Sequence, residues 1–252
     1  MSGVARVAAV TGGSLGIGRA IASRLAADGF TVAILARDVA RAGGVADSLG
    51  GVAVECDVTD YASVVSALVS VREGCGGVDV LVNNAGFDEF QPFLQTDPAG
   101  WQRLLAVNLL GVLNCTHVLA PAIVERCQVS GFGRIVNIAS DASRVGSTGE
   151  AVYSAAKGGV VAFSKSLARE LARAGVTVNV VSPGPTDTPM LDAIRATDFG
   201  GKVVDRIIAA SPRRRLALPD EIAGAVSYFV SADATFVTGQ ILSVSGGLTM
   251  AG

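Results

Sequence analysis

The chain has 252 residues, of which 50% are apolar and only 17% are charged, and its formal net charge is −2. No proline-rich linker, run of charges or internal repeat divides it, so we expect a single domain over residues 1–252 with a full core. The weakly acidic balance argues against nucleic acid as a general partner, and the apolar excess is typical of a sheet covered on both faces.

The first predicted unit binds a nucleotide. An apolar strand at Val7–Val10 leads into a glycine-rich turn, a helical pattern over residues 19–28 and a second strand at 31–36. The turn reads Thr11-Gly12-Gly13-Ser14-Leu15-Gly16-Ile17-Gly18. Glycines allow positive φ and close backbone approach, so a pyrophosphate can rest on the helix N-terminus. A glycine-rich turn alone is often only a turn, but strand, turn, helix and strand together favour a dinucleotide site.

Five further apolar runs predict strands, with helical patterns between them, at Val52–Val54, Val78–Val82, Arg134–Ile138, Thr177–Val181 and Gln240–Val244. Strands that alternate with helices predict right-handed βαβ units. We therefore expect a doubly wound, Rossmann-type α/β fold: a seven-stranded parallel sheet with helices on both faces. Ligands of such sheets lie beyond the carboxyl ends of the strands, and Asn83, Ser140 and Pro183 directly follow predicted strands.

The stretch Leu104–Val124 carries no formal charge when His117 is neutral, and its length would suit a membrane span. Asn108, Asn114 and Pro121 are among the residues that interrupt it. A buried core helix is therefore expected here, and no membrane partner.

The cysteines predict a reduced, cytoplasmic protein. Cys56, Cys75, Cys115 and Cys127 lack the spacing of zinc ligands, and the chain has a single histidine, so no metal site is expected. The segment Met1–Val4 has no basic region or long apolar run, so no secretory signal is expected either.

Ser140, Tyr153 and Lys157 form a candidate proton-transfer site. A helix predicted over Val152–Ala172 would put Tyr153 and Lys157 on one face, one turn apart. A phenol with a pKa of about 10 is a poor acid or base near neutrality, and a neighbouring ammonium lowers that pKa. A tyrosine and a lysine four residues apart are by themselves a weak signal. In most helices such a pair is a half-buried tyrosine packed beside the aliphatic stem of a lysine, with no catalytic role.

In combination, the motifs resemble the short-chain dehydrogenase/reductase superfamily, in its single-domain branch, from Val4 to Gly247. The motifs occur in the order typical of that superfamily: Thr11–Gly18, Cys56-Asp57-Val58, Asn83-Asn84-Ala85-Gly86, Asn108, Ser140, Tyr153-Ser154-Ala155-Ala156-Lys157 and Pro183-Gly184. The resemblance implies an enzyme that transfers a hydride between a nicotinamide cofactor and a ketone or secondary alcohol. A cofactor-sensing binding protein is the alternative, although such relatives typically lose the tyrosine or the lysine.

The resemblance also implies residue roles. Tyr153 would exchange a proton with the substrate oxygen, Ser140 would hold that oxygen, and Lys157 would lower the pKa of the tyrosine and bind the nicotinamide ribose. Asn108 would complete a proton relay through water. The implied cofactor contacts, besides Tyr153 and Lys157, are Gly12, Ser14, Leu15, Gly16, Ile17, Gly18, Arg37, Asp57, Val58, Asn84, Ala85, Gly86, Pro183, Gly184, Thr186 and Thr188. In the family, the residue at Asp57 accepts the adenine amino group, the segment at 83–86 packs the adenosine ribose, and the segment at 183–188 holds the nicotinamide carboxamide.

The residue at the end of the second strand determines whether this fold prefers NAD or NADP. NAD enzymes place an acidic residue there, against the ribose 2′-hydroxyl. This position falls at Ala36, and the next residue, Arg37, can grip a 2′-phosphate. We therefore expect NADP(H) to be preferred. NAD(H) stays possible because Asp38 can bind the ribose or pair with Arg37, and because Leu15 stands where many NADP-dependent relatives carry a second basic residue.

Residues 187–215 are expected to form a substrate lid, whose positive residues are Arg195, Lys202, Arg206, Arg213, Arg214 and Arg215. They indicate either a solvated helical face or a rim for a phosphorylated carrier such as coenzyme A or acyl carrier protein. Segments 140–153 and 243–250 resemble the 2-hydroxycyclohexanecarboxyl-CoA dehydrogenases, and the whole chain is similar to 3-oxoacyl reductases.

This resemblance implies a β-hydroxy or β-keto thioester, or a cyclic ketone, as the small-molecule substrate. A broad-specificity carbonyl reductase that acts on non-thioester ketones is the alternative. The resemblance further implies a homotetramer, with the apolar stretch Phe236–Met250 at a subunit interface.

Overall fold

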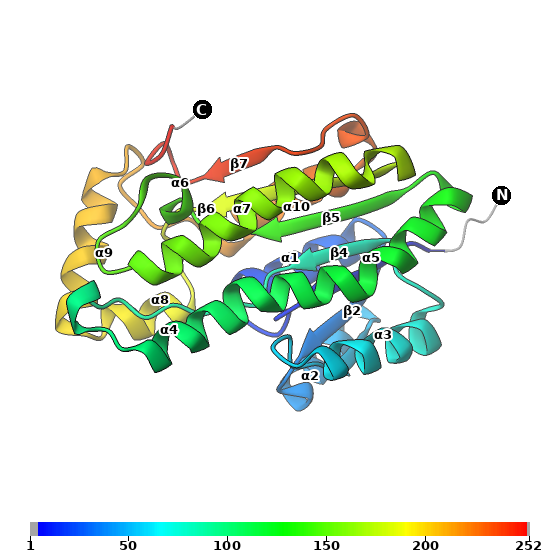
Figure 1. The fold of residues 1–252 in the computed structure, drawn as a ribbon, viewed down its shortest axis with the longest axis horizontal. Helices are drawn as coiled ribbons and strands as arrows, with labels where there is room; N and C mark the ends of the chain where they lie inside the picture. The colour runs from blue at the N-terminus through cyan, green and yellow to red at the C-terminus, as the bar shows by residue number, and fades with distance from the viewer. Residues whose placement is uncertain (1–4, 251–252) are drawn as a thin grey trace.

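A computed structural model describes residues 5–250, in which seven strands form one parallel sheet in the order β3-β2-β1-β4-β5-β6-β7 (Figure 1). The strands are β1 (Val7–Thr11), β2 (Thr31–Ala36), β3 (Val52–Glu55), β4 (Val80–Asn83), β5 (Gly133–Ile138), β6 (Val176–Pro183) and β7 (Ile241–Val244). The predicted fold class is confirmed. Met1–Val4, where no signal segment is expected, lie outside the described residues.

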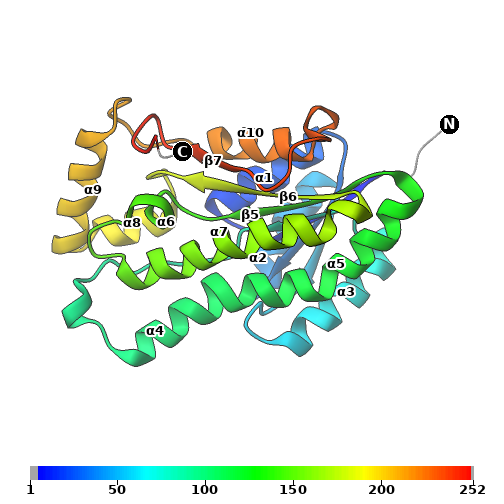
Figure 2. The ribbon, with the colours of Figure 1, turned by 45° about the horizontal axis from the view of Figure 1, so that its top comes forward.

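Helices cover both faces of the sheet (Figures 1 and 2). One layer contains α1 (Gly16–Ala27), α2 (Val39–Leu49) and α10 (Pro219–Val230), and the other contains α3 (Tyr61–Cys75), α5 (Gly111–Ser130) and α7 (Ala151–Leu171). Beyond the carboxyl edge of the sheet, toward which the strand arrows point, lie α6 (Ala142–Val145), α8 (Pro189–Arg195) and α9 (Asp198–Ala210).

The core consists of two apolar layers, because successive residues of a strand point to opposite faces. Val7 and Ala9 of β1 belong to the layer under α3 and α5, whereas Ala8 and Val10 belong to the layer under α1 and α10. Buried on both faces, the strands are continuous apolar runs, which is why their positions were predictable to within two residues.

Most boundaries differ from the predictions by one or two residues, and three of the differences bear on the site. Asn83 and Pro183, expected just after their strands, are the last residues of β4 and β6. Helix α1 begins at Gly16, inside the glycine turn, three residues before the predicted start at Arg19. This earlier start puts the first turn of α1 against the site expected to bind phosphate.

The predicted uncharged helix is part of a longer one. Helix α4 (Pro98–Leu105), a π-helical turn η2 (Ala106–Leu110) and α5 run on as 33 helical residues that are long and apolar enough to cross a membrane. Over half of the most apolar window, 56%, is buried inside the protein. Core helices pass the same test of length and composition, so this is weak evidence for a membrane span.

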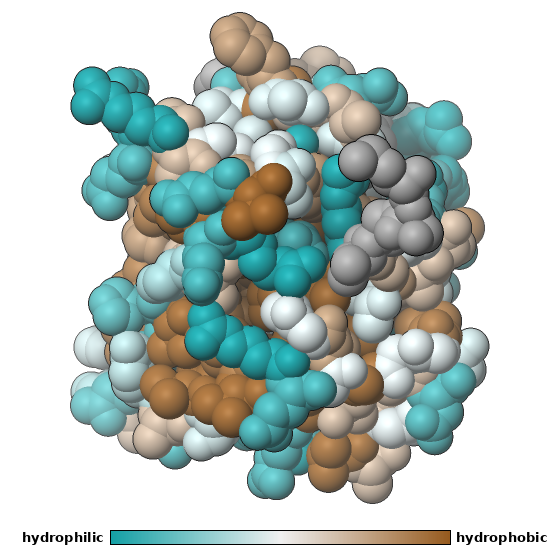
Figure 3. Space-filling view, turned by 90° about the vertical axis from the view of Figure 1, so that its right-hand side faces the viewer, coloured by the Kyte–Doolittle hydropathy of each residue, from teal (hydrophilic) through white to brown (hydrophobic). Residues whose placement is uncertain are grey.

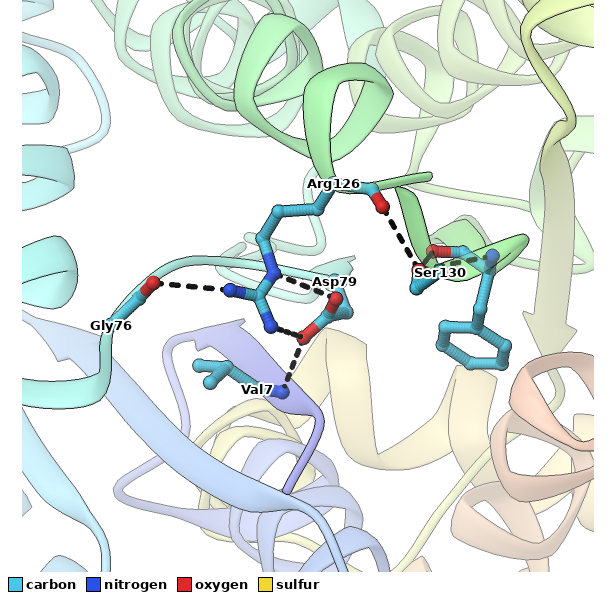
Figure 4. Close-up of polar contacts among 6 residues, drawn as sticks. Val7, Gly76, Asp79, Arg126 and Ser130 are labelled. Atoms are coloured by element: carbon cyan, nitrogen blue, oxygen red, sulfur yellow. Dashed lines mark hydrogen bonds and ion pairs between the residues drawn. The ribbon is translucent and has the colours of Figure 1, made fainter. Parts of the chain in front are cut away.

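At the amino edge of the sheet, a buried carboxylate joins three segments (Figure 4). Asp79, only 1% exposed, accepts hydrogen bonds from Arg126 Nε at 2.8 Å and from the Val7 amide at 2.8 Å. Arg126 also donates to the Gly76 carbonyl at 3.1 Å, and the Ser130 hydroxyl donates to the Arg126 carbonyl at 2.9 Å. This end of the molecule presents polar and apolar side chains intermixed (Figure 3).

Replacing Asp79 by Asn should destabilise the protein without changing its chemistry. The change leaves the half-buried guanidinium of Arg126 without its anion, which costs about 3–5 kcal/mol for a buried pair. For a chain of this size, that loss lowers Tm by roughly 10 °C in a thermal melt. Glu125→Gln on the same helix is the control, since its pair with Arg72 is exposed and should matter little. Equal melting of the two variants would contradict the structural role of Asp79.

Candidate active site

A cavity of about 840 Å³ opens at the carboxyl edge of the sheet, between the strand ends and α8 and α9. All eighteen cofactor positions implied by the resemblance line it, as do three of the four catalytic candidates, Ser140, Tyr153 and Lys157. Asn108 does not line the cavity; it lies behind it and is fully buried. The residues collected from the whole length of the chain thus meet in one place.

The glycine turn is shaped for close approach to a ligand. Gly12 and Gly16 have φ of 65° and 49°, a region that disfavours other residues. A Cβ on Gly18 would collide with the Gly12 carbonyl oxygen and the Asn84 side chain. Helix α1 begins here, and Leu15 at its N-cap provides no side-chain hydrogen bond. The free amides of the first turn are therefore available to an anion.

Asn84 buttresses this turn. Its Nδ2 donates to the carbonyl oxygens of Thr11 and Gly12 at 3.0 and 3.3 Å, and its backbone amide donates to Thr11 Oγ1 at 2.9 Å. The amide of Ala85 donates to the same hydroxyl at 3.0 Å. The segment 83–86, expected to pack the adenosine ribose, therefore also fixes the glycine turn on β1 through Asn84 and Ala85.

At the adenine end of the cavity, Asp57 accepts hydrogen bonds from the amide and the hydroxyl of Thr59 at 2.9 and 2.7 Å. These bonds and the charge of Arg37 hold the pKa of Asp57 below its usual value. An ionised carboxylate at this point accepts hydrogen bonds and suits the expected contact with an adenine amino group.

Two arginines, rather than one, line the cavity near the end of β2. Asp38 caps α2, accepting the Arg41 amide at 3.0 Å, and its carboxylate pairs with the Arg41 guanidinium at 3.3 Å. Asp38 is thus engaged with Arg41 and not with Arg37. Sequence reasoning missed Arg41, which lies in the first turn of α2, whereas Arg37 precedes that helix.

Tyr153 and Lys157 lie buried on α7, 8% and 3% exposed. The Ser140 side chain, which follows β5, is hydrogen-bonded to the phenol. Lys157 Nζ donates to the Ile138 carbonyl at 3.0 Å and lies 5.7 Å from the centre of the tyrosine ring. The carboxyl end of β5 therefore fixes the serine and the lysine on either side of the phenol.

The balance of charges around the phenol differs from the expectation. Burial, followed by the charges of Asp88 and Glu150, raises the pKa of Tyr153 above its ordinary value, while the Ser140 hydrogen bond opposes the shift. Burial lowers the pKa of Lys157 to about 8, against the charge of Asp88. The overall shift of the tyrosine pKa is thus upward, and the lowering expected from Lys157 is not among its causes. The phenol holds its proton at neutral pH and is poised to donate it.

Asn108 interrupts the long helix. Its Nδ2 donates to the carbonyl of Leu104, four residues earlier, at 3.0 Å, and to that of Phe87 at 2.8 Å, and it stands within the π-helical turn η2. Its buried Oδ1 has no hydrogen-bond partner. A Cβ on Gly86 would lie 2.6 Å from this oxygen and 3.3 Å from Lys157 Nζ. The two polar groups thus face a common point, as a relay between them requires.

At the opposite end of the cavity, the threonines of the segment 183–188 fix the start of the lid. Thr188 caps α8, accepting the Leu191 amide at 3.3 Å, and its hydroxyl also contacts the Thr186 carbonyl at 3.3 Å. The Thr186 hydroxyl donates to the Gly184 carbonyl at 2.9 Å. These bonds hold the segment expected to bind the nicotinamide carboxamide against β6.

A pair of carboxyl groups in the cavity was not anticipated. Asp88 and Glu150 are hydrogen-bonded to each other beside Tyr153, and Glu150 is only 7% exposed. Burial, followed by the hydrogen bond and charge of Glu150, raises the pKa of Asp88 well above its usual range. The two residues are 62 positions apart (150 minus 88), and no local pattern links them.

The positive residues of segment 187–215 have different surroundings. Arg206 lines the cavity from α9, whereas Arg195 pairs with Asp205 at 3.4 Å and Arg215 pairs with Glu221 at 2.6 Å. Within residues 5–250, all four cysteines are free thiols, and no group of three or more histidine, cysteine, aspartate or glutamate residues could hold a metal ion.

Comparisons with known proteins agree with this geometry. A family model described as enoyl-(acyl carrier protein) reductase matches residues 12–249. The 3-oxoacyl-(acyl-carrier-protein) reductase of Escherichia coli (strain K12) is 40% identical over 97% of this chain and 98% of its own length. The acetoacetyl-CoA reductase of Rhizobium meliloti is 41% identical over 97% and 98%, and the nodulation protein G of Azospirillum brasilense is 41% identical over 96% and 98%.

Two solved structures share the whole fold. The 3-ketoacyl-(acyl-carrier-protein) reductase of Brucella melitensis, complexed with NADH, superimposes with a TM-score of 0.90 at 33% identity, covering 97% of this chain and 98% of the other. An actinorhodin polyketide ketoreductase variant with NADPH gives a TM-score of 0.89 at 37% identity and covers 97% of each chain.

Proposed function

The chain belongs to the short-chain dehydrogenase/reductase family whose model it matches over residues 12–249, and we propose that it is an NADPH-dependent ketoreductase of β-keto thioesters. The observation that carries the proposal is the meeting of Ser140, Tyr153 and Lys157 with the glycine turn in one cavity. A sensor of the cofactor would have no need of a buried, protonated phenol beside a serine hydroxyl.

The residues of the cavity fit a dinucleotide. The uncapped start of α1 and the missing side chain at Gly18 suit a pyrophosphate, and the ionised Asp57 suits an adenine amino group. Arg37 offers a 2′-phosphate its guanidinium group, and Arg41, whose guanidinium also pairs with Asp38, lines the same part of the cavity. This supports NADPH as the preferred cofactor, with NADH as a poorer substitute.

The proposed mechanism assigns one task to each catalytic side chain. A bound nicotinamide supplies the hydride. Ser140 holds the ketone oxygen, and Tyr153 donates its proton to that oxygen as negative charge develops there. Lys157 stabilises the resulting phenolate, and Asn108 Oδ1 faces the ammonium across Gly86, where a water can return the proton. Oxidation of the alcohol reverses these steps.

The substrate enters under the segment 187–215, which we propose as the lid. The relatives named for acyl-carrier and CoA substrates support a thioester, and Arg206 on the cavity rim supports a carrier with phosphate groups. We further propose a cytoplasmic homotetramer, supported by the exposed apolar side chains of Phe236, Leu242 and Met250 in its C-terminal stretch.

The proposed reaction is tested by following NADPH oxidation with three kinds of substrate: a β-ketoacyl-CoA, a cyclic ketone and an enoyl-CoA. Turnover of the β-ketoacyl-CoA with the highest kcat/KM is expected. Preference for the cyclic ketone would favour a broad carbonyl reductase, and preference for the enoyl-CoA would follow the description of the family model. Binding of NADPH without any turnover would favour the cofactor sensor.

Reversing the charge at Arg206 should raise KM for a CoA thioester by about tenfold, since one charge-assisted contact to a phosphate contributes roughly 1.5 kcal/mol. The effect should weaken as salt screens the exposed rim. KM for a neutral cyclic ketone should stay unchanged. Arg195→Glu is the control, because Arg195 is already paired with Asp205 and lies outside the cavity lining. Equal effects on thioester and ketone would favour a solvated helical face.

A further inference from the structure

The paired carboxyl groups of Asp88 and Glu150 lie in the part of the cavity that faces the lid. Gly149, next to Glu150, has φ of 83°, and a Cβ there would lie 2.6 Å from the ring of Phe199 on α9. The Gln91 amide donates to the Gly149 carbonyl at 2.9 Å, which ties the segment carrying Asp88 to the one carrying Glu150. The pair therefore stands between Tyr153 and the lid, where a substrate must lie.

The pair carries a single negative charge near neutral pH. Two carboxyl groups in hydrogen-bond contact, one buried and the other partly buried, disfavour double ionisation, so they share one proton. The Glu89 amide donates to Asp88 Oδ1 at 2.8 Å, and Ser147 is hydrogen-bonded to Glu150. These partners anchor the two carboxyl groups, and the pair acts on a substrate through its charge.

Other charged groups in this part of the cavity leave that charge in place. Lys157 donates to the Ile138 carbonyl at 3.0 Å, and its charge attracts that of Asp88 but is shared with this carbonyl and with the phenol ring. Asp141, also at the cavity wall, accepts the Ser243 hydroxyl at 2.6 Å. Arg206 is exposed on the rim. The cavity thus holds the carboxyl pair and the Lys157 ammonium beside the reacting carbonyl, and it holds Arg206 at its mouth.

We propose that Asp88 and Glu150 form an anionic selectivity element, which rejects substrates with a negative charge close to the ketone and admits neutral β-keto esters and thioesters. This inference rests on the proposed ketoreductase function and narrows its substrate class. A free β-keto acid carries its carboxylate two bonds from the ketone carbon and would meet the pair directly. A thioester is neutral there, and its phosphates lie far along the carrier, at the positive rim.

The test compares kcat/KM for acetoacetate and for methyl acetoacetate, which share the same β-keto group and differ in charge. With NADPH, the wild-type protein should prefer the ester by more than about tenfold, the size expected for one unscreened charge within a few ångströms of another. Because Glu150 is buried and Asp88 is partly buried, high salt should change this ratio less than it changes the effect at the exposed Arg206. Equal use of acid and ester by the wild-type protein would overturn the proposal without any variant.

Variants of the two carboxyl residues test the proposal a second time. In Asp88→Asn alone, Glu150 remains as the charged member of the pair, so the preference for the ester should persist. In the double variant Asp88→Asn/Glu150→Gln the charge is gone, and the ester-to-acid ratio should fall by about tenfold. Glu89→Gln is the matched control, because Glu89 is exposed, adjacent to Asp88 and outside the cavity lining.

An unchanged ratio in a double variant that still binds NADPH and reduces the ester would contradict the proposal. If the double variant does not fold, the comparison of acid with ester in the wild-type protein still decides. Failure of the proposed function would look different, because the wild-type protein would then reduce neither the ester nor a β-ketoacyl-CoA.

Discussion

Tyr153→Phe should lose nearly all reductase activity and keep its affinity for NADPH. The substitution removes the proton donor and leaves the ring packed on α7, so kcat should fall by about 10²–10⁴-fold, the range for loss of a general acid. The Kd for NADPH, measured by fluorescence titration, should stay close to that of the wild-type protein. Because burial and the nearby carboxyl groups raise the pKa of this phenol, the reductive rate should hold at neutral pH, whereas alcohol oxidation should rise with pH.

The control for this variant is Tyr228→Phe, which removes the hydroxyl of a tyrosine on α10 that is 44% exposed. Its activity should match that of the wild-type protein. Retention of more than about a tenth of the activity by Tyr153→Phe would show that another group supplies the proton, because loss of a general acid costs far more than this.

Arg37→Ala should lower kcat/KM for NADPH by about 10–100-fold, since a charge-assisted bond to phosphate contributes roughly 1.5–3 kcal/mol. The value of kcat/KM for NADH should change little, because NADH lacks the 2′-phosphate. Adding Arg41→Ala should lower the NADPH value further, as both guanidinium groups line the cavity near the end of β2. The structure strengthens this expectation, because Asp38 is engaged with Arg41 and capping α2.

Arg169→Ala, at an exposed position of α7 outside the cavity lining, is the matched control and should leave both constants unchanged. A wild-type protein that prefers NADH would overturn the assignment of Arg37. Equal losses with both cofactors would point to a structural role for this arginine.

The features that were predictable from the sequence are local in the chain. The apolar runs gave the strands because both faces of the sheet are covered, and the glycine spacing of 12–18 gave the turn before α1. Tyr153 and Lys157 are one helical turn apart, so their common face followed from spacing alone. The spacing does not say what the two side chains do. Their role in proton transfer was inferred from the resemblance to the short-chain dehydrogenase/reductase superfamily.

The features that were missed depend on tertiary contacts. Asp88 and Glu150 meet only because the loop after β4 packs against the segment before α7. The direction of the pKa shift at Tyr153 depends on that meeting and on burial, neither of which a four-residue spacing reveals. The π-helical turn at Asn108 likewise requires the Phe87 carbonyl from a distant loop as a second acceptor.

The central claim is that a hydride reaches the ketone carbon of a β-keto thioester while Tyr153 protonates its oxygen. The most direct measurement is mass spectrometry of the product formed from acetoacetyl-CoA with NADPH deuterated at the transferring position of the nicotinamide. The proposed reaction predicts 3-hydroxybutyryl-CoA with one deuterium at carbon 3 and none at carbon 2, and no such product from Tyr153→Phe. Absence of deuterium transfer to acetoacetyl-CoA, with efficient labelling of an enoyl-CoA instead, would contradict it.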